Sequence, residues 1–304
     1  MNIKRRNFLQ NAGIVTAGAL LMPQIACQSP VKDTSKEAKI VEPLMPSPSL
    51  NKFGIQLYTL RDVIQENPKE ILKTLSTFGF NQIEGYEGKK GLFWGMTNTE
   101  FKKYTSDLGL NMVSSHCDIN KDFEKKAAQA AEIGMEYLVC PWIGPQKSKD
   151  DWKKVTDKLN ACGEICKKNG IRFAYHNHDY SFKSFSGMIP HNYMMDNTDP
   201  ATVDFEMDIY WVVTGGADPI EYLEKYPNRF RLCHVKDRLK SAAPDEKKAT
   251  CNLGTGQIDF PKILKVAQAN GMKHYIMEQE DYQGASPMDS AKIGADYLKN
   301  LVFA

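Results

Sequence analysis

The segment Gly170-Ile171-Arg172-Phe173-Ala174 begins where a helical pattern ends and leads directly into an apolar strand. The same order of a glycine, an apolar residue, two variable residues and an apolar strand recurs at 79–83, 109–113, 134–138 and 271–275. Glycine just after a helix adopts the left-handed conformation that stops the helix. The five copies therefore predict five helix-to-strand junctions of one kind, and repeated helix-strand order predicts a parallel sheet.

Eight stretches have the composition of strands, near 53–58, 82–86, 112–116, 137–142, 172–176, 202–208, 230–235 and 274–278. Residues 52–304 also come close to the roughly 250 residues typical of a (β/α)8 barrel. An open doubly wound sheet is the main alternative, but it normally has a glycine-rich loop after its first strand, and residues 58–62 (Tyr-Thr-Leu-Arg-Asp) are not one. We therefore predict a single α/β domain, a (β/α)8 TIM barrel over 52–304.

The N-terminal residues have the pattern of an export signal. Arg5-Arg6 precedes Phe8-Leu9 and an apolar run at 12–22 that is too short to span a bilayer, which is typical of the twin-arginine type. We predict an export signal over 1–27 and a periplasmic protein, with a plain membrane anchor as the alternative. Cys27 is a candidate for lipidation and would be the point of membrane attachment. Residues 28–51, rich in proline, serine and lysine, are predicted to be a disordered linker.

Composition restricts the partners. The chain is 42% hydrophobic and carries a formal net charge of +2, with basic and acidic residues spread throughout, so it lacks the basic surface of a nucleic-acid-binding protein. A small polar molecule is the expected ligand, and oligomerisation stays open. The cysteines after residue 27 show no zinc-site spacing and are predicted to be apolar packing residues: Cys117, Cys140, Cys162, Cys166, Cys233 and Cys251.

Polar residues gather at the predicted C-terminal strand ends, where barrel enzymes place their active sites. These ends carry Glu84, His116, His176, His178, Glu206, Asp208, His234, Lys236, Glu278 and Glu280. Imidazoles and carboxylates from neighbouring strands suit one divalent ion such as Mn²⁺, Zn²⁺, Co²⁺ or Mg²⁺. A single histidine at a strand end is more often a hydrogen-bonded core residue. The three residues Asp208, His234 and Glu278 on consecutive strands instead favour metal binding.

Four segments, 175–179 (YHNHD), 205–211 (FEMDIYW), 232–237 (LCHVKD) and 276–279 (IMEQ), resemble the sugar phosphate isomerase/epimerase family of xylose-isomerase-like barrels. The resemblance covers about 52–304 and implies that Asp208, His234 and Glu278 hold the metal. At the fifth strand this chain has His176 where ketose epimerases carry a glutamate, so His176 becomes the expected fourth ligand, with His178 as the alternative. Loss of that glutamate counts against an epimerase mechanism with two glutamates.

The resemblance also suggests roles in catalysis. Glu278 is expected to move the substrate proton as well as bind metal, His176 is the alternative base, and Lys236 is expected to stabilise an enolate oxyanion. The predicted substrate-binding residues, each with a packing or supporting role as the alternative, are Glu84, His116, His178, Trp142 and Trp211.

These residues predict a metal-dependent isomerase, epimerase or lyase that acts next to a carbonyl of a non-phosphorylated sugar or keto-sugar through an enediolate. A lyase or hydrolase that cleaves 3-keto-glycosides is one alternative, because that reaction needs one base and one acid. A non-catalytic sugar-binding lipoprotein is a second alternative. A metal-dependent nuclease is disfavoured by the nearly neutral charge.

Overall fold

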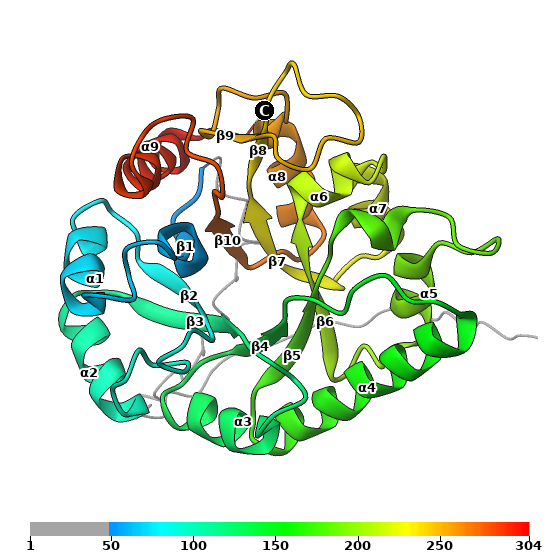
Figure 1. Cartoon of the computed structure of the whole chain (residues 1–304), viewed down its shortest axis with the longest axis horizontal. Coiled ribbons are helices and arrows are strands. Elements are labelled where there is room, and N and C mark those ends of the chain that lie inside the picture. The colour runs from blue at the N-terminus through cyan, green and yellow to red at the C-terminus, as the bar shows by residue number, and fades with distance from the viewer. Residues whose placement is uncertain (1–48, 304) are drawn as a thin grey trace, which may run out of the picture. The chain divides into compact units, whose positions relative to one another are not determined.

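The computed structural model describes residues 49–303 and contains a closed barrel of parallel strands in the order β1-β10-β7-β6-β5-β4-β3-β2 (Figure 1). Its strands are β1 (Gly54–Gln56), β2 (Gln82–Tyr86), β3 (Asn111–His116), β4 (Tyr137–Cys140), β5 (Arg172–His176), β6 (Val203–Asp208), β7 (Phe230–Val235) and β10 (His274–Met277). The predicted fold class is confirmed, and each predicted strand overlaps one of these.

The five predicted glycine junctions are confirmed by the backbone. The glycines at positions 79, 109, 134, 170 and 271 have φ angles of 102°, 73°, 77°, 76° and 93°. A residue with a Cβ atom is disfavoured in this left-handed region, which is why glycine recurs at the same point of each unit. These turns aim each new strand into the barrel with its C-terminal end at the same face.

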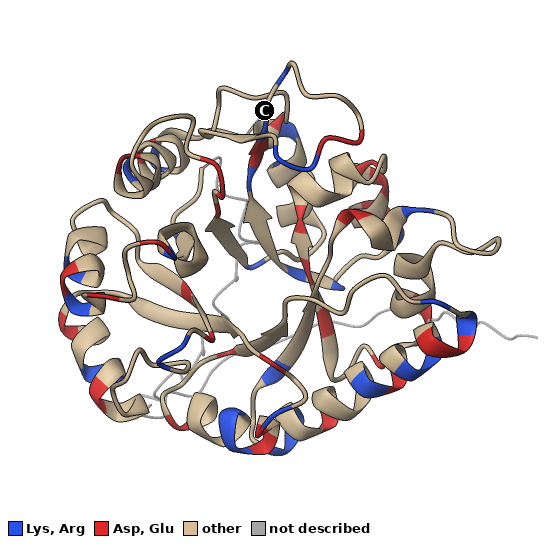
Figure 2. Ribbon diagram, in the orientation of Figure 1, with Lys and Arg blue, Asp and Glu red and all other residues tan. Residues whose placement is uncertain are grey.

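An outer layer of helices surrounds the barrel (Figure 1). It comprises α1 (Pro68–Ser76), α2 (Asn98–Asp107), α3 (Phe123–Glu132), α4 (Lys149–Lys168), α5 (Pro190–Asn197), α6 (Ile209–Thr214), α7 (Pro219–Lys225), α8 (Phe260–Ala269) and α9 (Pro287–Asn300). Helix α4 buries Trp152, Leu159 and Cys166, whereas Figure 2 shows charges of both signs along its length. Burial of this apolar stripe against the sheet holds the helix in place.

Several local features differ from the sequence prediction. The first strand was expected over 53–58 but ends at Gln56, because the Gln56 side chain accepts a 3.0 Å hydrogen bond from the Tyr58 amide and begins the 3-10 helix η1 (Leu57–Leu60). Helix α2 is the helix expected before the glycine at position 109, whereas α5, α6 and the short antiparallel pair β8 (Asp237–Arg238) and β9 (Thr250–Cys251) were not predicted. The six cysteines are free and buried, which confirms their predicted packing role.

The predicted export signal and nearly all of the predicted linker lie outside the described residues. Within 49–303, none of the helices combines the length and the apolar character needed to cross a bilayer.

Candidate active site

The end of β6 is fixed by hydrogen bonds that place Asp208 at the barrel mouth. Asp208 caps α6, since its Oδ1 accepts a 2.9 Å hydrogen bond from the Trp211 amide. The side chain of Asn177, just after β5, exchanges two 3.1 Å hydrogen bonds with the Asp208 backbone. Because side chains alternate along a strand, Glu206 and Asp208 both point into the barrel. The strand therefore places one carboxylate, Glu206, deeper in the barrel and another, Asp208, nearer its mouth.

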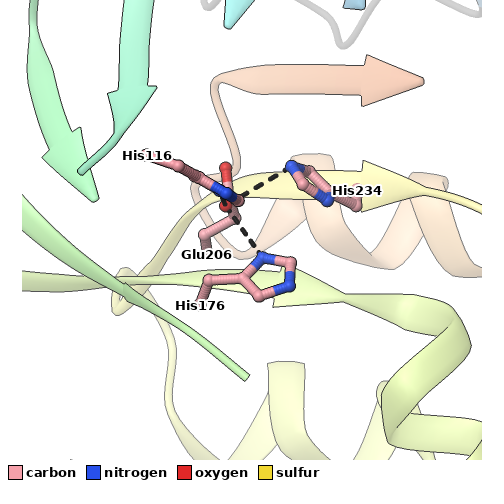
Figure 3. A group of neighbouring side chains, drawn as sticks. All are labelled: His116, His176, Glu206 and His234. Carbon is pink, nitrogen blue, oxygen red and sulfur yellow. Dashed lines mark hydrogen bonds and ion pairs between the residues drawn. The ribbon is translucent and has the colours of Figure 1, made fainter. Parts of the chain in front are cut away.

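The deeper carboxylates, Glu84 and Glu206, contact three histidine rings, and Figure 3 shows Glu206 with His116, His176 and His234. Oε2 of Glu206 lies 2.7 Å from His116 Nε2 and 2.9 Å from His176 Nδ1. Oε1 of Glu84 lies 2.6 Å from His234 Nε2. Glu84 is held in turn by Gln56 and Ser114, which donate hydrogen bonds of 2.8 and 2.6 Å. We call Glu84, Glu206 and His116 the inner set.

A second group of ligand-type atoms lies closer to the mouth. Asp208 Oδ2 is 3.7 Å from His176 Nε2 and 3.8 Å from His234 Nδ1, and His234 Nδ1 is 3.2 Å from Glu278 Oε2. Asp208 Oδ2 is buried and has no hydrogen-bond partner, although burying such an atom is costly. We call His176, Asp208, His234 and Glu278 the outer set, and it is the predicted ligand set.

Two histidines of the outer set, His176 and His234, connect it to the inner carboxylates in a way that favours metal binding by the outer set. His176 and His234 each present one ring nitrogen to an inner carboxylate and the other to the outer carboxylates. Metal-binding histidines usually donate their second ring N–H to a carboxylate. Ligands about 2.0–2.2 Å from one ion lie roughly 3–3.5 Å apart, and the outer separations of 3.2, 3.7 and 3.8 Å come close to this range. The residues present therefore fit a divalent ion at the outer set.

The buried titratable groups inside the barrel differ in their protonation. Burial raises the pKa of Glu206, and the nearby Glu84 raises it further, to about 7. Burial acts the same way on Glu84, but the charges of His116 and His234 outweigh it and lower the Glu84 pKa to about 2. Burial, reinforced by the neighbouring histidines, holds the pKa of His176 well below 6.5. His176 is thus neutral, which is the form that binds metal.

Lys236 lies among the carboxylates rather than at the cavity wall. Its Nζ is 3.1 Å from Glu278 Oε2, 2.9 Å from Glu280 Oε1 and 3.6 Å from Asp208 Oδ2, and the side chain is fully buried. Burial raises the pKa of Glu278, but the charges of Lys236 and His234 outweigh this and hold it well below its ordinary value. Lys236 therefore keeps Glu278 ionised. Its predicted contact with an enolate oxyanion stays a prediction.

A cavity of about 540 Å³ opens above the outer set. Of the predicted substrate-binding residues, His116, His178 and Trp142 line it, together with the predicted ligands His176 and Glu278. Glu84 lies in the inner set instead. Trp211 is only 8% exposed and packs against His178, with ring centroids 5.2 Å apart, and against Lys236. These two residues support others rather than face the cavity.

Glu206 was expected at a strand end without a role of its own, and the structure places it at the centre of the inner set. A signal was present, because Glu206 precedes Asp208 by two residues on a strand and must share its face. The contact between Glu206 and His116 joins β6 to β3, which are not adjacent in the barrel, and no local pattern predicts such a pair.

Comparison with known proteins agrees with this architecture. The family model described as xylose isomerase-like TIM barrel matches residues 72–301. The chain belongs to this family. A solved structure of a sugar phosphate isomerase/epimerase from Parabacteroides distasonis superimposes with a TM-score of 0.70 at 29% identity, over 85% of this chain and 97% of that one.

Two further proteins are similar to this chain, one in sequence and one in fold. An inosose dehydratase from Clostridium perfringens is 28% identical over 166 residues, which are 50% of this chain and 55% of that protein. The chain thus spans about half the length of this relative. A xylose isomerase-like TIM barrel protein from Mycobacterium smegmatis, solved in complex with magnesium, superimposes with a TM-score of 0.63 at 12% identity, over 82% of this chain and 96% of that one. At this identity the likeness shows the fold alone.

Proposed function

We propose that this protein is a divalent-metal-dependent enzyme that removes a proton next to a carbonyl of a non-phosphorylated sugar or keto-sugar. The observation that carries the proposal is the orientation of His176 and His234, each held by an inner carboxylate on one nitrogen and facing the outer carboxylates with the other. The outer set would hold the ion. The ion would polarise the carbonyl and thereby acidify the neighbouring C–H bond.

The residues around the cavity would move the protons. Glu278, ionised and lining the cavity, takes the proton from the carbon next to the carbonyl. In an elimination, the electrons of that C–H bond form a C=C bond while the C–O bond to the leaving group on the next carbon breaks. The leaving oxygen takes up a proton. His116 is suited to supply it, since its ring lines the cavity and is fixed by Glu206 at 2.7 Å.

Among the reactions of this class, elimination fits the residues best. An epimerase of the two-glutamate type needs a second carboxylate at the fifth strand, where this chain has His176. Elimination needs one base and one acid, which Glu278 and His116 provide. The similarity to inosose dehydratases, whose name denotes loss of water from a keto-sugar, supports the same choice. Isomerisation or epimerisation with His176 as the second base is the alternative.

The charges around the cavity support an uncharged substrate. Four carboxylates line the cavity, those of Glu87, Asp118, Glu278 and Glu280, against one lysine, Lys121. A phosphate dianion would be repelled by this excess of negative charge. We expect kcat/KM to be higher for a free sugar than for its phosphate ester, and the reverse order would contradict this part of the proposal.

The test is turnover by the metal-loaded protein on a panel of ketoses, inososes and 3-keto-glycosides, with products identified by NMR. The proposal predicts an unsaturated product or released leaving group from a keto-sugar, lost on chelation and restored by Mn²⁺ or another divalent ion. Saturable sugar binding with no product from any of these substrates would instead favour a non-catalytic binding protein.

We further propose that the protein is exported, on the basis of Arg5-Arg6 and the apolar run at 12–22. Cell fractionation should place a shortened chain outside the cytoplasm, and Cys27→Ser should release the protein from membranes if Cys27 is lipidated. Full-length protein retained in the cytoplasm would contradict export.

A further inference from the structure

Large apolar side chains that remain exposed are few in this protein, and two of them border one cavity. Among the described residues, four such side chains are exposed: Tyr58 (39%), Trp142 (55%), Ile293 (39%) and Val302 (62%). The two aromatic ones, Tyr58 and Trp142, both line the cavity above the outer set. Exposed aromatic surface is costly in water, and its concentration at a cavity marks a binding surface.

Both rings are held in place by neighbours. Trp142 packs edge-on against His178 and Tyr180, with centroid distances of 4.6 and 4.9 Å. Tyr58 packs edge-on against Tyr86 at 5.1 Å. Fixed rings lose little conformational entropy when a ligand stacks on them.

Tyr58 and Trp142 lie at separate points around the mouth of the barrel. Tyr58 follows β1 and Trp142 follows β4, and β2 and β3 separate these strands in the barrel. The catalytic groups Glu278 and His116 line the same cavity. A volume of about 540 Å³ falls within the range of pockets for drug-sized ligands and exceeds what one sugar ring fills. Space therefore remains between the reacting ring and the exposed aromatics.

We propose that Trp142 and Tyr58 form a subsite for a second ring, joined by a glycosidic bond to the sugar that reacts at the outer set. The occupant is a ring with an apolar face, either the C–H face of a second sugar or an aromatic aglycone. This inference rests on the proposed function, because it makes the second ring the leaving group of the elimination. The substrate class is then a keto-glycoside rather than a free monosaccharide.

The first measurement is kinetic and uses three 3-keto-glucosides that differ only in the leaving group: glucosyl, aryl and methyl. The ratio of kcat/KM for a two-ring substrate to that for the methyl glycoside should exceed one, and should fall about tenfold in Trp142→Ala, as expected for loss of one stacked aromatic ring. Trp142→Phe should retain most of the ratio. Ile293→Ala, which truncates a side chain as exposed as Tyr58 but outside the cavity, should leave the ratio unchanged. The same ratio in Trp142→Ala, Tyr58→Ala and the wild type would overturn the proposal.

The second measurement separates this inference from the proposed function. Saturation-transfer NMR with unoxidised disaccharide and aryl glucoside reports binding without turnover, and shows whether the sugar or the aryl ring is the preferred occupant. Loss of the second-ring signal in the Trp142→Ala, Tyr58→Ala double variant supports the subsite even if no keto-sugar is turned over. An undiminished signal contradicts the subsite even if turnover is observed.

Discussion

Nδ1 of His234 lies 3.2 Å from Oε2 of Glu278, across the contact between the parallel neighbours β7 and β10. The other nitrogen of the same ring is 2.6 Å from Glu84. His234 thus connects a carboxylate that lines the cavity to one that is fully buried. This connection gives the proposed metal site of the outer set a supporting carboxylate behind one of its histidines.

The ligand assignment predicts metal content. Protein purified without chelators should contain about one divalent ion per chain, and Asp208→Ala or His234→Ala should lose it. Asp204→Asn is a matched control, because Asp204 lies on the same strand but bonds to Arg172 and Tyr137 instead. Elemental analysis is the measurement. Stoichiometric metal in both ligand variants would show that the site lies elsewhere.

The inner set is predicted to support the ion without binding it. Glu206→Gln removes a charge behind His176 while keeping the shape, so metal affinity should fall by about 10- to 100-fold with the stoichiometry unchanged. Competition with a fluorescent chelator gives the affinity. Complete loss of metal in Glu206→Gln would indicate that the inner set, not the outer one, holds the ion.

Lys236 is predicted to stabilise the metal-free protein. Lys236→Met removes one of the two buried positive charges beside Glu278 and Asp208, which costs about 3–5 kcal/mol and lowers the unfolding temperature in chelator by on the order of 10 °C. A bound divalent ion should recover much of this loss, since it supplies positive charge at the same carboxylates. Thermal unfolding with and without metal tests this. An unchanged unfolding temperature in chelator would argue against the role.

His191 is predicted to make the fold sensitive to acid. Its ring is buried beside Phe182, at a centroid distance of 4.5 Å, and burial with the charge of Arg229 lowers its pKa from 6.5 to about 3. Between these values the unfolded chain binds a proton that the folded chain excludes, so this stability is present above pH 6.5 and is lost as pH falls. The loss by pH 5 is about 2 kcal/mol.

His191→Phe keeps a ring of similar shape and removes the titrating group. Urea unfolding at pH 7.5 and pH 5 should show a fall in the free energy of unfolding about 2 kcal/mol smaller in the variant than in the wild type. An equal fall in both proteins would mean that other groups carry the acid sensitivity.

The repeating part of the molecule could be predicted from sequence, because each unit carries its own signal. The glycine at position 170 must follow a helix and precede a strand whatever the rest of the chain does. Short elements such as α6 were missed, since its six residues, Ile209–Thr214, follow strand β6 directly after the cap Asp208 with no break visible in the sequence. The residues of the outer set could be proposed as ligands because they lie at strand ends. Which strand-end side chains line the cavity and which lie below it could not be predicted. Glu84 and Trp211 are directed away from the cavity by packing partners that are distant in sequence.

We propose that the metal-loaded protein removes a proton next to a carbonyl and that Glu278 is the base. The most direct test is the rate of solvent deuterium exchange at that carbon of a bound keto-sugar, followed by NMR in the wild type and in Glu278→Gln at equal metal content. Loss of a general base typically costs about 10²–10⁴ in rate. We expect exchange in the wild type and a loss of this size in Glu278→Gln. Exchange near the wild-type rate in Glu278→Gln, with metal bound, would contradict it and make His176 the first alternative base.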